Sequence, residues 1–218
     1  MMQFRKGGWL VCLATLALSA TTAWAAEDKF TGGAEVGFNI TTVGLGGNNT
    51  AGIHASPRTG LIIDAFAQYA FTDVISLQSE FVYSQKRLKI YDGANPNNFQ
   101  ANENLDVFEI PLLVRVNAIK PKTAPGFYLV MGPGFGYRLR AHETKRIEGG
   151  KAQPDNNNNS EFNKASYSII GGAGITKGKW DVEGRYQAGI RSLLNNGPND
   201  DSTAHEHTFT MLLRWRFK

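Results

Sequence analysis

The stretch LIIDAFAQYAFTDVISLQSEFVYS, residues 61–84, decides the fold. It contains two runs in which apolar and polar or small residues alternate, as in Leu61, Ile63 and Ala65 around Asp64, or Phe81 and Tyr83 beside Glu80. A period of two is typical of a strand with two unlike faces, whereas an amphipathic helix repeats every 3.6 residues. Residues 72–74 (TDV) separate the two runs, and the stretch is predicted to form a β-hairpin.

Six further segments outside this hairpin show the same alternation. They span residues 34–40, 108–117, 127–140, 166–175, 180–190 and 208–217. With the hairpin they make eight segments, each close to the roughly 9–11 residues that a tilted transmembrane strand needs. We find no comparable amphipathic helix and, after the N-terminal region, no apolar run of about 20 residues. The pattern predicts an all-β fold, an eight-stranded antiparallel up-and-down transmembrane β-barrel.

The connections between the segments alternate in length. Residues 72–74, 118–125 and Gly178 form short links, whereas the other four links are long and polar. These long links are residues 42–57, 89–104, 141–163 and 192–206. Outer-membrane barrels have long extracellular loops and short periplasmic turns. A soluble β-sandwich is not expected to sort its loops in this way.

The first 25 residues have the features of a secretory signal peptide. Arg5 and Lys6 precede an apolar run, WLVCLATLALSA, that is too short to span a bilayer, and Ala23 and Ala25 flank Trp24 as in a cleavage site. We expect cleavage after Ala25, which leaves residues 26–218 as one barrel domain. An uncleaved hydrophobic anchor is the alternative. Cleavage removes Cys12, the only cysteine, so the mature chain has neither a disulfide nor a thiolate metal site.

Charge gives little sign of a polyanionic partner. The formal net charge of +4 falls to +2 when Arg5 and Lys6 leave with the signal peptide. Lysines and arginines do not cluster with interleaved aromatic residues, and a nucleic-acid partner is therefore not expected.

Aromatic residues lie toward the two ends of the predicted strands. Such positions are typical of the aromatic girdles where lipid meets water. The girdle residues expected near the short turns are Tyr69, Phe71, Phe127, Trp180, Trp215 and Phe217. Those expected near the long loops are Tyr83, Phe135, Tyr137 and Tyr167, with Phe108 and Phe209.

The inward positions carry acids and bases in similar numbers. They are Glu35, Asp64, Glu80, Glu109, Asp181 and Glu183 against Arg115, Arg138, Arg140, Arg185, Arg214 and Arg216. Side chains just fill the interior of an eight-stranded barrel, and buried charges need partners. We therefore expect a structural ion network that plugs the lumen, with inward glycines making room for long side chains. A catalytic role for these acids and arginines is the less favoured interpretation.

Five pieces of the chain resemble known outer-membrane proteins. They are GGAEVGFNI, AQYAFTDVISLQSEFVYSQK, FEIPLLVRV, GFYLVMGPGFGYRL and GGAGITKGKWDVEGRYQAGIRSL. The sequence is similar to the PorT-like families and, more broadly, to the small OmpA/OmpX-type barrels of Gram-negative bacteria. The resemblance implies a location in the outer membrane. It also links PorT-like relatives to protein secretion.

Three classes of function remain open at this level. The favoured one is a non-enzymatic, monomeric barrel whose long loops contact lipopolysaccharide or extracellular or secretion-system proteins. A narrow porin-like channel and a lipid-modifying rim enzyme are the alternatives. A rim enzyme needs a histidine with a nucleophile and an acid, and all four histidines, His54, His142, His205 and His207, lie in predicted loops. His205-Glu206-His207 is a weak metal motif because a third ligand at a fixed spacing is missing. Neither a cofactor nor a catalytic or metal site is expected.

Overall fold

The computed structural model describes residues 29–46, 53–92, 99–119, 125–147, 153–155, 163–192 and 203–217. The predicted signal peptide, residues 1–25, lies outside these ranges. They form nine strands: β1 (Phe30–Gly46), β2 (Ile53–Ala70), β3 (Ile75–Asp92), β4 (Phe99–Ile119), β5 (Gly126–Ile147), β6 (Gln153–Asp155), β7 (Ala165–Lys177), β8 (Trp180–Gly189) and β9 (Thr203–Arg216). Within the described ranges, no helix is long and apolar enough to cross a membrane.

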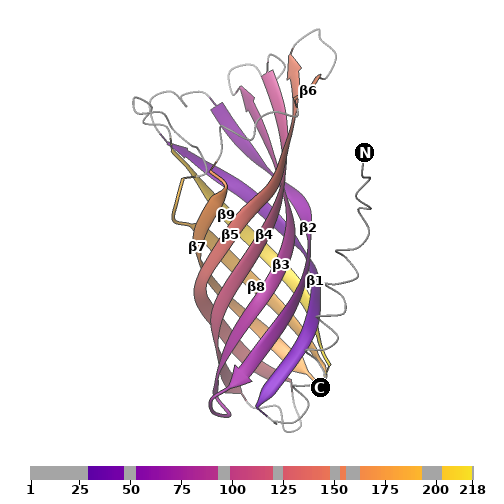
Figure 1. Ribbon diagram of the computed structural model, residues 1–218, viewed down its shortest axis with the longest axis vertical. Coiled ribbons are helices and arrows are strands. Elements are labelled where there is room, and N and C mark those ends of the chain that lie inside the picture. Colours follow the sequence, from indigo (N-terminus) through magenta and orange to yellow (C-terminus); the bar gives the residue numbers. More distant parts are fainter. Residues whose placement is uncertain are drawn as a thin grey trace, which may run out of the picture.

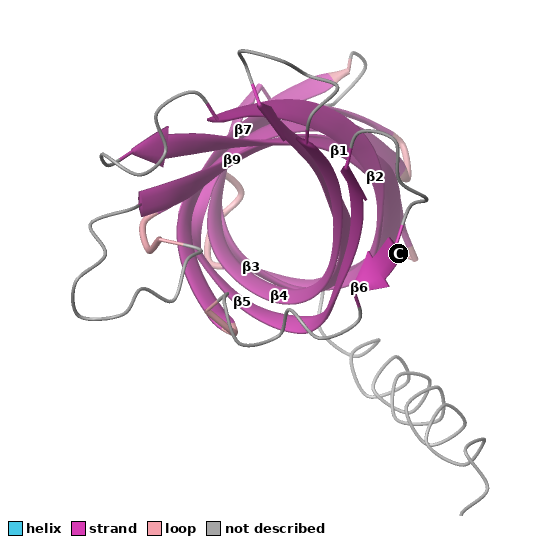
Figure 2. Cartoon of the chain, turned by 90° about the horizontal axis from the view of Figure 1, so that it is seen from above, coloured by secondary structure: helices cyan, strands magenta, loops and turns pink. Residues whose placement is uncertain are grey.

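Eight of the strands close into a barrel. The hydrogen-bonded order is β4-β3-β2-β1-β9-β8-β7-β5, and an additional pairing of β4 with β5 joins the two ends of the sheet. All neighbours are antiparallel, and Figures 1 and 2 show the tilted strands and the closed ring. Closure satisfies the backbone groups that an open sheet edge would expose to lipid. This arrangement confirms the predicted fold class.

The strands are longer than the alternation predicts. β4 and β5 contain 21 and 22 residues, and their pairing continues to Phe99↔Ile147. The predicted loops 42–57, 89–104, 141–163 and 192–206 are therefore partly strand, and the first of them includes the end of β1 and the start of β2. The three-residue strand β6 pairs with β5 inside the third of these segments. Alternating apolar and polar residues mark only those parts of a strand that have one face toward lipid and the other toward the lumen. Where both faces of a strand contact water, its backbone hydrogen bonds are enough to hold it, and no alternation is needed.

The short connections lie at the end of the barrel where the described chain begins and ends. Residues 71–74 join β2 to β3, and Gly178 and Lys179 join β7 to β8. Gly178 has a φ of 61°, a left-handed conformation that suits glycine in a tight turn. At the same end, the Phe217 amide donates a hydrogen bond to the Gly32 carbonyl. Both ends of the described chain therefore lie on the side of the short turns (Figure 1).

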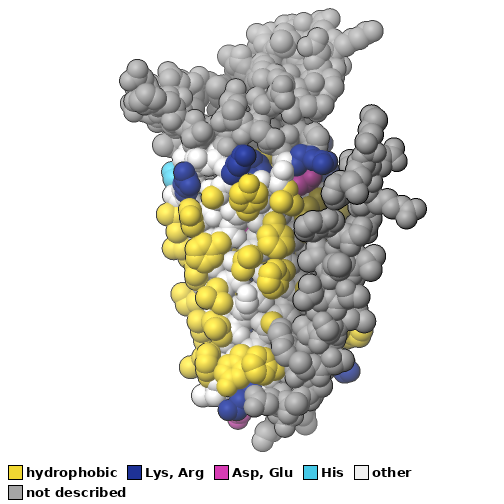
Figure 3. Space-filling model, viewed as in Figure 1, with side chains coloured by type: hydrophobic (Ala, Val, Ile, Leu, Met, Phe, Trp, Pro, Cys, Tyr) yellow, Lys and Arg dark blue, Asp and Glu magenta, His cyan; other side chains and the backbone are white. Residues whose placement is uncertain are grey.

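The outer face of the barrel carries a belt of exposed apolar side chains. Figure 3 shows these side chains covering the wall below a row of lysine and arginine side chains. Among the predicted girdle residues, Trp180 and Trp215 stack at a ring distance of 6.1 Å, and Phe135 meets Tyr167 at 5.9 Å. Nine of the twelve are exposed, and Tyr69, Tyr83 and Phe108 are half-buried. The exposed ones are Phe71, Phe127, Phe135, Tyr137, Tyr167, Trp180, Phe209, Trp215 and Phe217.

Candidate functional site

The interior of the barrel contains a large group of charged side chains. Alternation along each strand turns every second residue inward, and ten of the twelve charged residues predicted to face inward are buried. They are Glu35, Asp64, Glu80, Glu109, Arg115, Arg138, Asp181, Glu183, Arg185 and Arg214. Of the other two, Arg140 is exposed, and Arg216 lies toward the turn end of β9 with 23% of its side chain exposed.

Arg214 on β9 is the centre of the network. Its Nε lies 2.6 Å from an oxygen of Glu35 on the neighbouring strand β1. Its Nη1 donates a hydrogen bond of 2.7 Å to Gln78 on β3, and its Nη2 lies 3.3 Å from Glu183 on β8. The guanidinium carbon also lies 4.5 Å from the ring centre of Phe66. The side chain is fully buried, and its charge therefore depends on these contacts for stabilisation.

Arg185 on β8 connects the two sides of the lumen. Its Nη1 and Nη2 donate hydrogen bonds of 2.5 and 2.6 Å to the two oxygens of Glu80 on β3. Its Nε contacts Glu183 on its own strand. In the sheet, β9, β1 and β2 lie between β8 and β3, so the pair with Glu80 crosses the interior. The bidentate geometry is the strongest arrangement available to arginine and a carboxylate.

A second group of charges lies toward the short turns. Arg115 on β4 donates a hydrogen bond of 2.9 Å to Asp181 on β8, and its guanidinium lies 3.4 Å from the ring centre of Tyr128. Arg216 lies 3.3 Å from the same aspartate and donates a hydrogen bond of 2.6 Å to the Gly178 carbonyl. β5 and β7 separate β4 from β8 in the sheet, so the Arg115–Asp181 pair also crosses the lumen.

A third group lies toward the open end and was missed by the sequence analysis. Lys86 on β3 lies 2.8 Å from Glu109 on β4 and 2.5 Å from Glu206 on β9. Thr208 donates a hydrogen bond of 2.8 Å to Glu206, and Gln187 donates one of 2.9 Å to Glu109. Continuing the alternation of β3 by one step beyond Ser84 would have found Lys86. Glu206 was placed in a loop because its neighbours lack the apolar alternation.

Apolar side chains also contribute to the interior. One cluster contains Leu113, Tyr128, Val130 and Ile170, a second contains Ile62, Val82 and Leu212, and a third contains Leu105 and Val107 with Val43 against them. The alternation predicts only a polar filling, so these apolar residues of the interior are a finding of the structure. A Cβ added at Gly174 would lie 2.3 Å from the Tyr128 ring, which shows that this inward glycine makes room for a large side chain across the strand pair.

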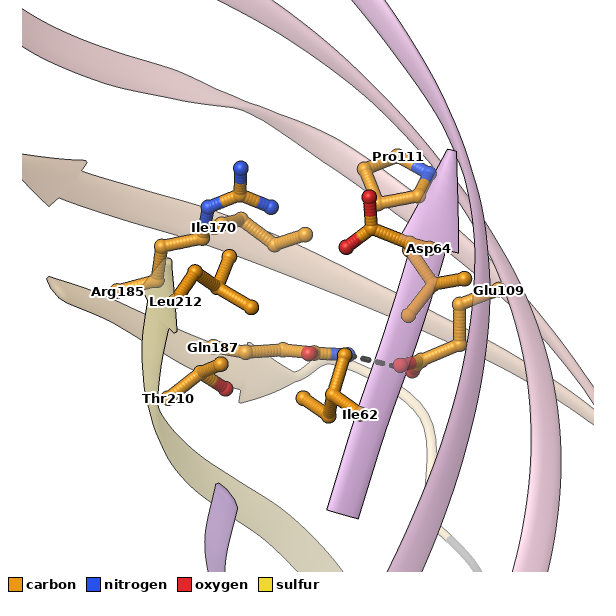
Figure 4. Close-up of a pocket in the computed structure, with 10 residues that line it drawn as sticks. Ile62, Asp64, Glu109, Pro111, Ile170, Arg185, Gln187, Thr210 and Leu212 are labelled. Atoms are coloured by element: carbon orange, nitrogen blue, oxygen red, sulfur yellow. Dashed lines mark hydrogen bonds between the residues drawn. The ribbon is translucent and has the colours of Figure 1, made fainter. Parts of the chain in front are cut away.

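A small cavity remains within this packing. Its volume is about 20 Å³, and Asp64, Glu109, Arg185 and Gln187 contribute its polar lining together with Thr210. Figure 4 shows these side chains converging from opposite walls, with Gln187 bonded to Glu109. A volume of this size accommodates about one water molecule.

Two expectations about single residues are wrong. Arg140 is exposed, because a register shift between Asp106 and Val107 sets two steps of β5 against one of β4 and interrupts the alternation. The four histidines predicted to lie in loops are in strands, and on β9 Glu206 points inward whereas His205 and His207 are partly exposed on the other face. His207 Nδ1 lies 2.8 Å from the Tyr186 hydroxyl. His54 and His142 lie in the upper parts of β2 and β5.

Two solved bacterial structures show a distant likeness to this chain. The attachment invasion locus protein Ail of Yersinia pestis, solved with the heparin analogue sucrose octasulfate, is 11% identical and has a TM-score of 0.42. The match covers 87% of this chain and 99% of Ail. OprG of Pseudomonas aeruginosa is 11% identical over 86% of this chain and 94% of its own, with a TM-score of 0.45.

Sequence comparison identifies the family. Among curated proteins, none matches the chain. The profile of the outer membrane protein beta-barrel domain matches residues 25–195, well over half of the chain. The matched region contains β1 to β8, including the inward acids and arginines of those strands. The chain therefore belongs to the outer membrane protein beta-barrel domain family and is located in the outer membrane of a Gram-negative bacterium.

Proposed function

We propose that this protein is a non-enzymatic barrel with a closed lumen that acts at the cell surface through the strands and loops at its open end. The observation that carries the closed lumen is the set of ion pairs between distant strands. Arg115–Asp181, Arg185–Glu80 and Lys86–Glu206 each join two strands that are not neighbours in the sheet. With the apolar clusters among them, these pairs support a filled interior.

Ion pairs that cross the lumen oppose the opening of a pore through the barrel. Separating a buried pair leaves a charge without a partner in a medium of low polarity, at a cost of about 3–5 kcal/mol. A continuous water path would have to pass all three cross-lumen pairs. The porin-like alternative is therefore less favoured than a closed barrel.

The purified protein is expected to give no steady open conductance in planar bilayers, because side chains fill its lumen. The measurement is single-channel recording at both polarities after insertion of the refolded barrel. The double variant Glu80→Ala/Arg185→Ala is a useful comparison, because it removes a cross-lumen pair without leaving either charge alone. Reproducible single-channel steps from wild type would favour the porin-like alternative.

The open end supports a role at the surface. There β4 pairs with β3 as far as Tyr91↔Gln100 and with β5 as far as Phe99↔Ile147, whereas β8 already ends at Gly189. One side of the barrel therefore extends beyond the other. Lipopolysaccharide and extracellular or secretion-system proteins are the proposed partners of this end, and the PorT-like affiliation stays a prediction. The rim-enzyme alternative has little support, because the described contacts of His205 and His207 are the Gly189 carbonyl and the Tyr186 hydroxyl.

A cysteine at Asn157 is expected to react with a membrane-impermeant maleimide on intact cells. Asn157 lies outside the described residues, in the segment between β6 and β7, and the long loops of outer-membrane barrels are generally extracellular. The matched control is Asp73→Cys in the short turn between β2 and β3, which should react only after the outer membrane is permeabilised. Labelling of Asp73→Cys and protection of Asn157→Cys on intact cells would invert the topology.

A further inference from the structure

Asp64 on β2 differs from the other buried acids of the lumen. Only 8% of its surface is exposed. Among the residues that the structure describes, none donates a hydrogen bond to either of its carboxylate oxygens. The side chain points into the small interior cavity (Figure 4). A buried carboxylate without a partner is costly, and this position therefore suggests a missing partner.

Two further carboxylates lie beside Asp64. Glu35 on β1 is its cross-strand neighbour, and Glu80 on β3 is paired with Phe66, two residues along β2 from Asp64. One oxygen from each of the three acids lies within 4.8 Å of the others. All three carboxylates are buried, and three adjacent strands hold them on the inner wall.

The charges around this group leave one acid in excess. The acids are Glu35, Asp64, Glu80, Asp181 and Glu183, and the cations are Arg115, Arg185, Arg214 and Arg216. The arginines already contact other acids of the group: Arg185 pairs with Glu80 and Glu183, and Arg214 pairs with Glu35 and Glu183. Arg115 and Arg216 both contact Asp181. A single additional positive charge would balance the group.

We propose that Asp64, Glu35 and Glu80 bind one monovalent metal cation, with sodium as the ion that fits. Oxygen ligands suit hard cations, and oxygens separated by up to 4.8 Å can be bridged by an ion that takes ligands at about 2.3–2.6 Å, the range known for calcium. Sodium is close to calcium in size and carries the single charge that the group lacks. A divalent ion would leave one positive charge in excess.

The arrangement of three acids around one point favours a metal ion over a proton. One ion can bind an oxygen of each carboxylate, whereas a proton joins at most two oxygens. The adjoining cavity of about 20 Å³ has room for a water molecule as a further ligand. This inference does not depend on the proposed surface role or on the absence of conductance.

The test compares the thermal unfolding of the refolded mature chain in sodium chloride and in N-methyl-D-glucamine chloride at equal ionic strength. The bulky organic cation cannot enter the site, so wild type should unfold a few degrees higher in sodium chloride, because a ligand of the folded state stabilises it. Asp64→Asn should unfold at the same temperature in both salts. The matched control Asp106→Asn, at a half-buried residue outside the group, should keep the wild-type difference.

Sodium NMR relaxation provides a measurement that does not depend on the folding of a variant. Wild type in detergent should show a bound fraction that saturates at one ion per barrel. Equal unfolding temperatures of wild type in the two salts, a sodium effect that survives in Asp64→Asn, or the absence of a saturable bound fraction would each overturn the proposal. A midpoint that depends on pH and not on the cation would assign a proton to Asp64 instead.

Discussion

Replacing Arg214 by alanine is expected to lower the free energy of unfolding by about 3–5 kcal/mol. The guanidinium contacts Glu35 at 2.6 Å and Glu183 at 3.3 Å, and it donates a hydrogen bond to Gln78. Alanine would leave these buried carboxylates with fewer positive partners and would add a cavity beside Phe66. The measurement is urea unfolding of the refolded barrel in lipid vesicles, followed by tryptophan fluorescence.

Two variants serve as controls for Arg214→Ala. Arg216→Ala removes the same group from a partly exposed position in the same strand and should cost clearly less. His205→Ala, on the outer face, should unfold like wild type. If Arg214→Ala and Arg216→Ala lower stability equally, the central place of Arg214 is wrong. If Arg214→Ala and Arg216→Ala both unfold like wild type, neither arginine contributes to a buried ion network, and the argument for a plugged lumen also fails.

Replacing Lys86 by alanine is expected to cost at least as much, because the lysine is the shared partner of Glu109 and Glu206. Its loss would leave two buried carboxylates near one another, beside the neutral hydrogen-bond donors Gln187 and Thr208. We expect a loss of about 3–5 kcal/mol, the range for breaking a buried pair from one side. The same urea unfolding measures it.

A triple variant separates lost charge pairing from lost packing at Lys86. The variant Lys86→Met/Glu109→Gln/Glu206→Gln removes all three charges at nearly constant side-chain volume. It should recover most of the stability lost in Lys86→Ala, because replacing a complete buried ionic group by neutral residues often costs little stability. Lys164→Ala, at an exposed lysine, should have little effect. A triple variant as unstable as Lys86→Ala would show that packing of the lysine stem is the main contribution.

The inward and outward faces of the transmembrane wall could be predicted from the sequence alone. Alternation is a local property of each strand, since successive side chains point to opposite sides. Glu35, Asp64 and Arg214 could therefore be assigned to the interior without any knowledge of their partners. The same pattern, counted over eight segments, gave the number of strands and hence a barrel small enough to be filled by side chains.

Other features depended on the third dimension. A pair such as Glu80–Arg185 joins residues separated by 105 positions, and only the closure and stagger of the barrel bring β3 opposite β8. The choice of Arg214 over Arg216 as the central arginine follows from depth along β9, which alternation does not encode. The exposure of Arg140 follows from a local register shift.

The ends of the strands and the apolar part of the lumen were decided by tertiary structure for a related reason. Toward the open end β4 and β5 are held by backbone hydrogen bonds, which any residue except proline can make, so the sequence there has no alternating signature. Leu113, Tyr128 and Ile170 pack together inside the barrel although outward-facing residues beside them are equally apolar. Hydropathy distinguishes residues that face lipid from residues that face water. Both faces of the barrel wall can bury apolar side chains, however, so only the closed barrel determines which apolar side chains meet in the lumen.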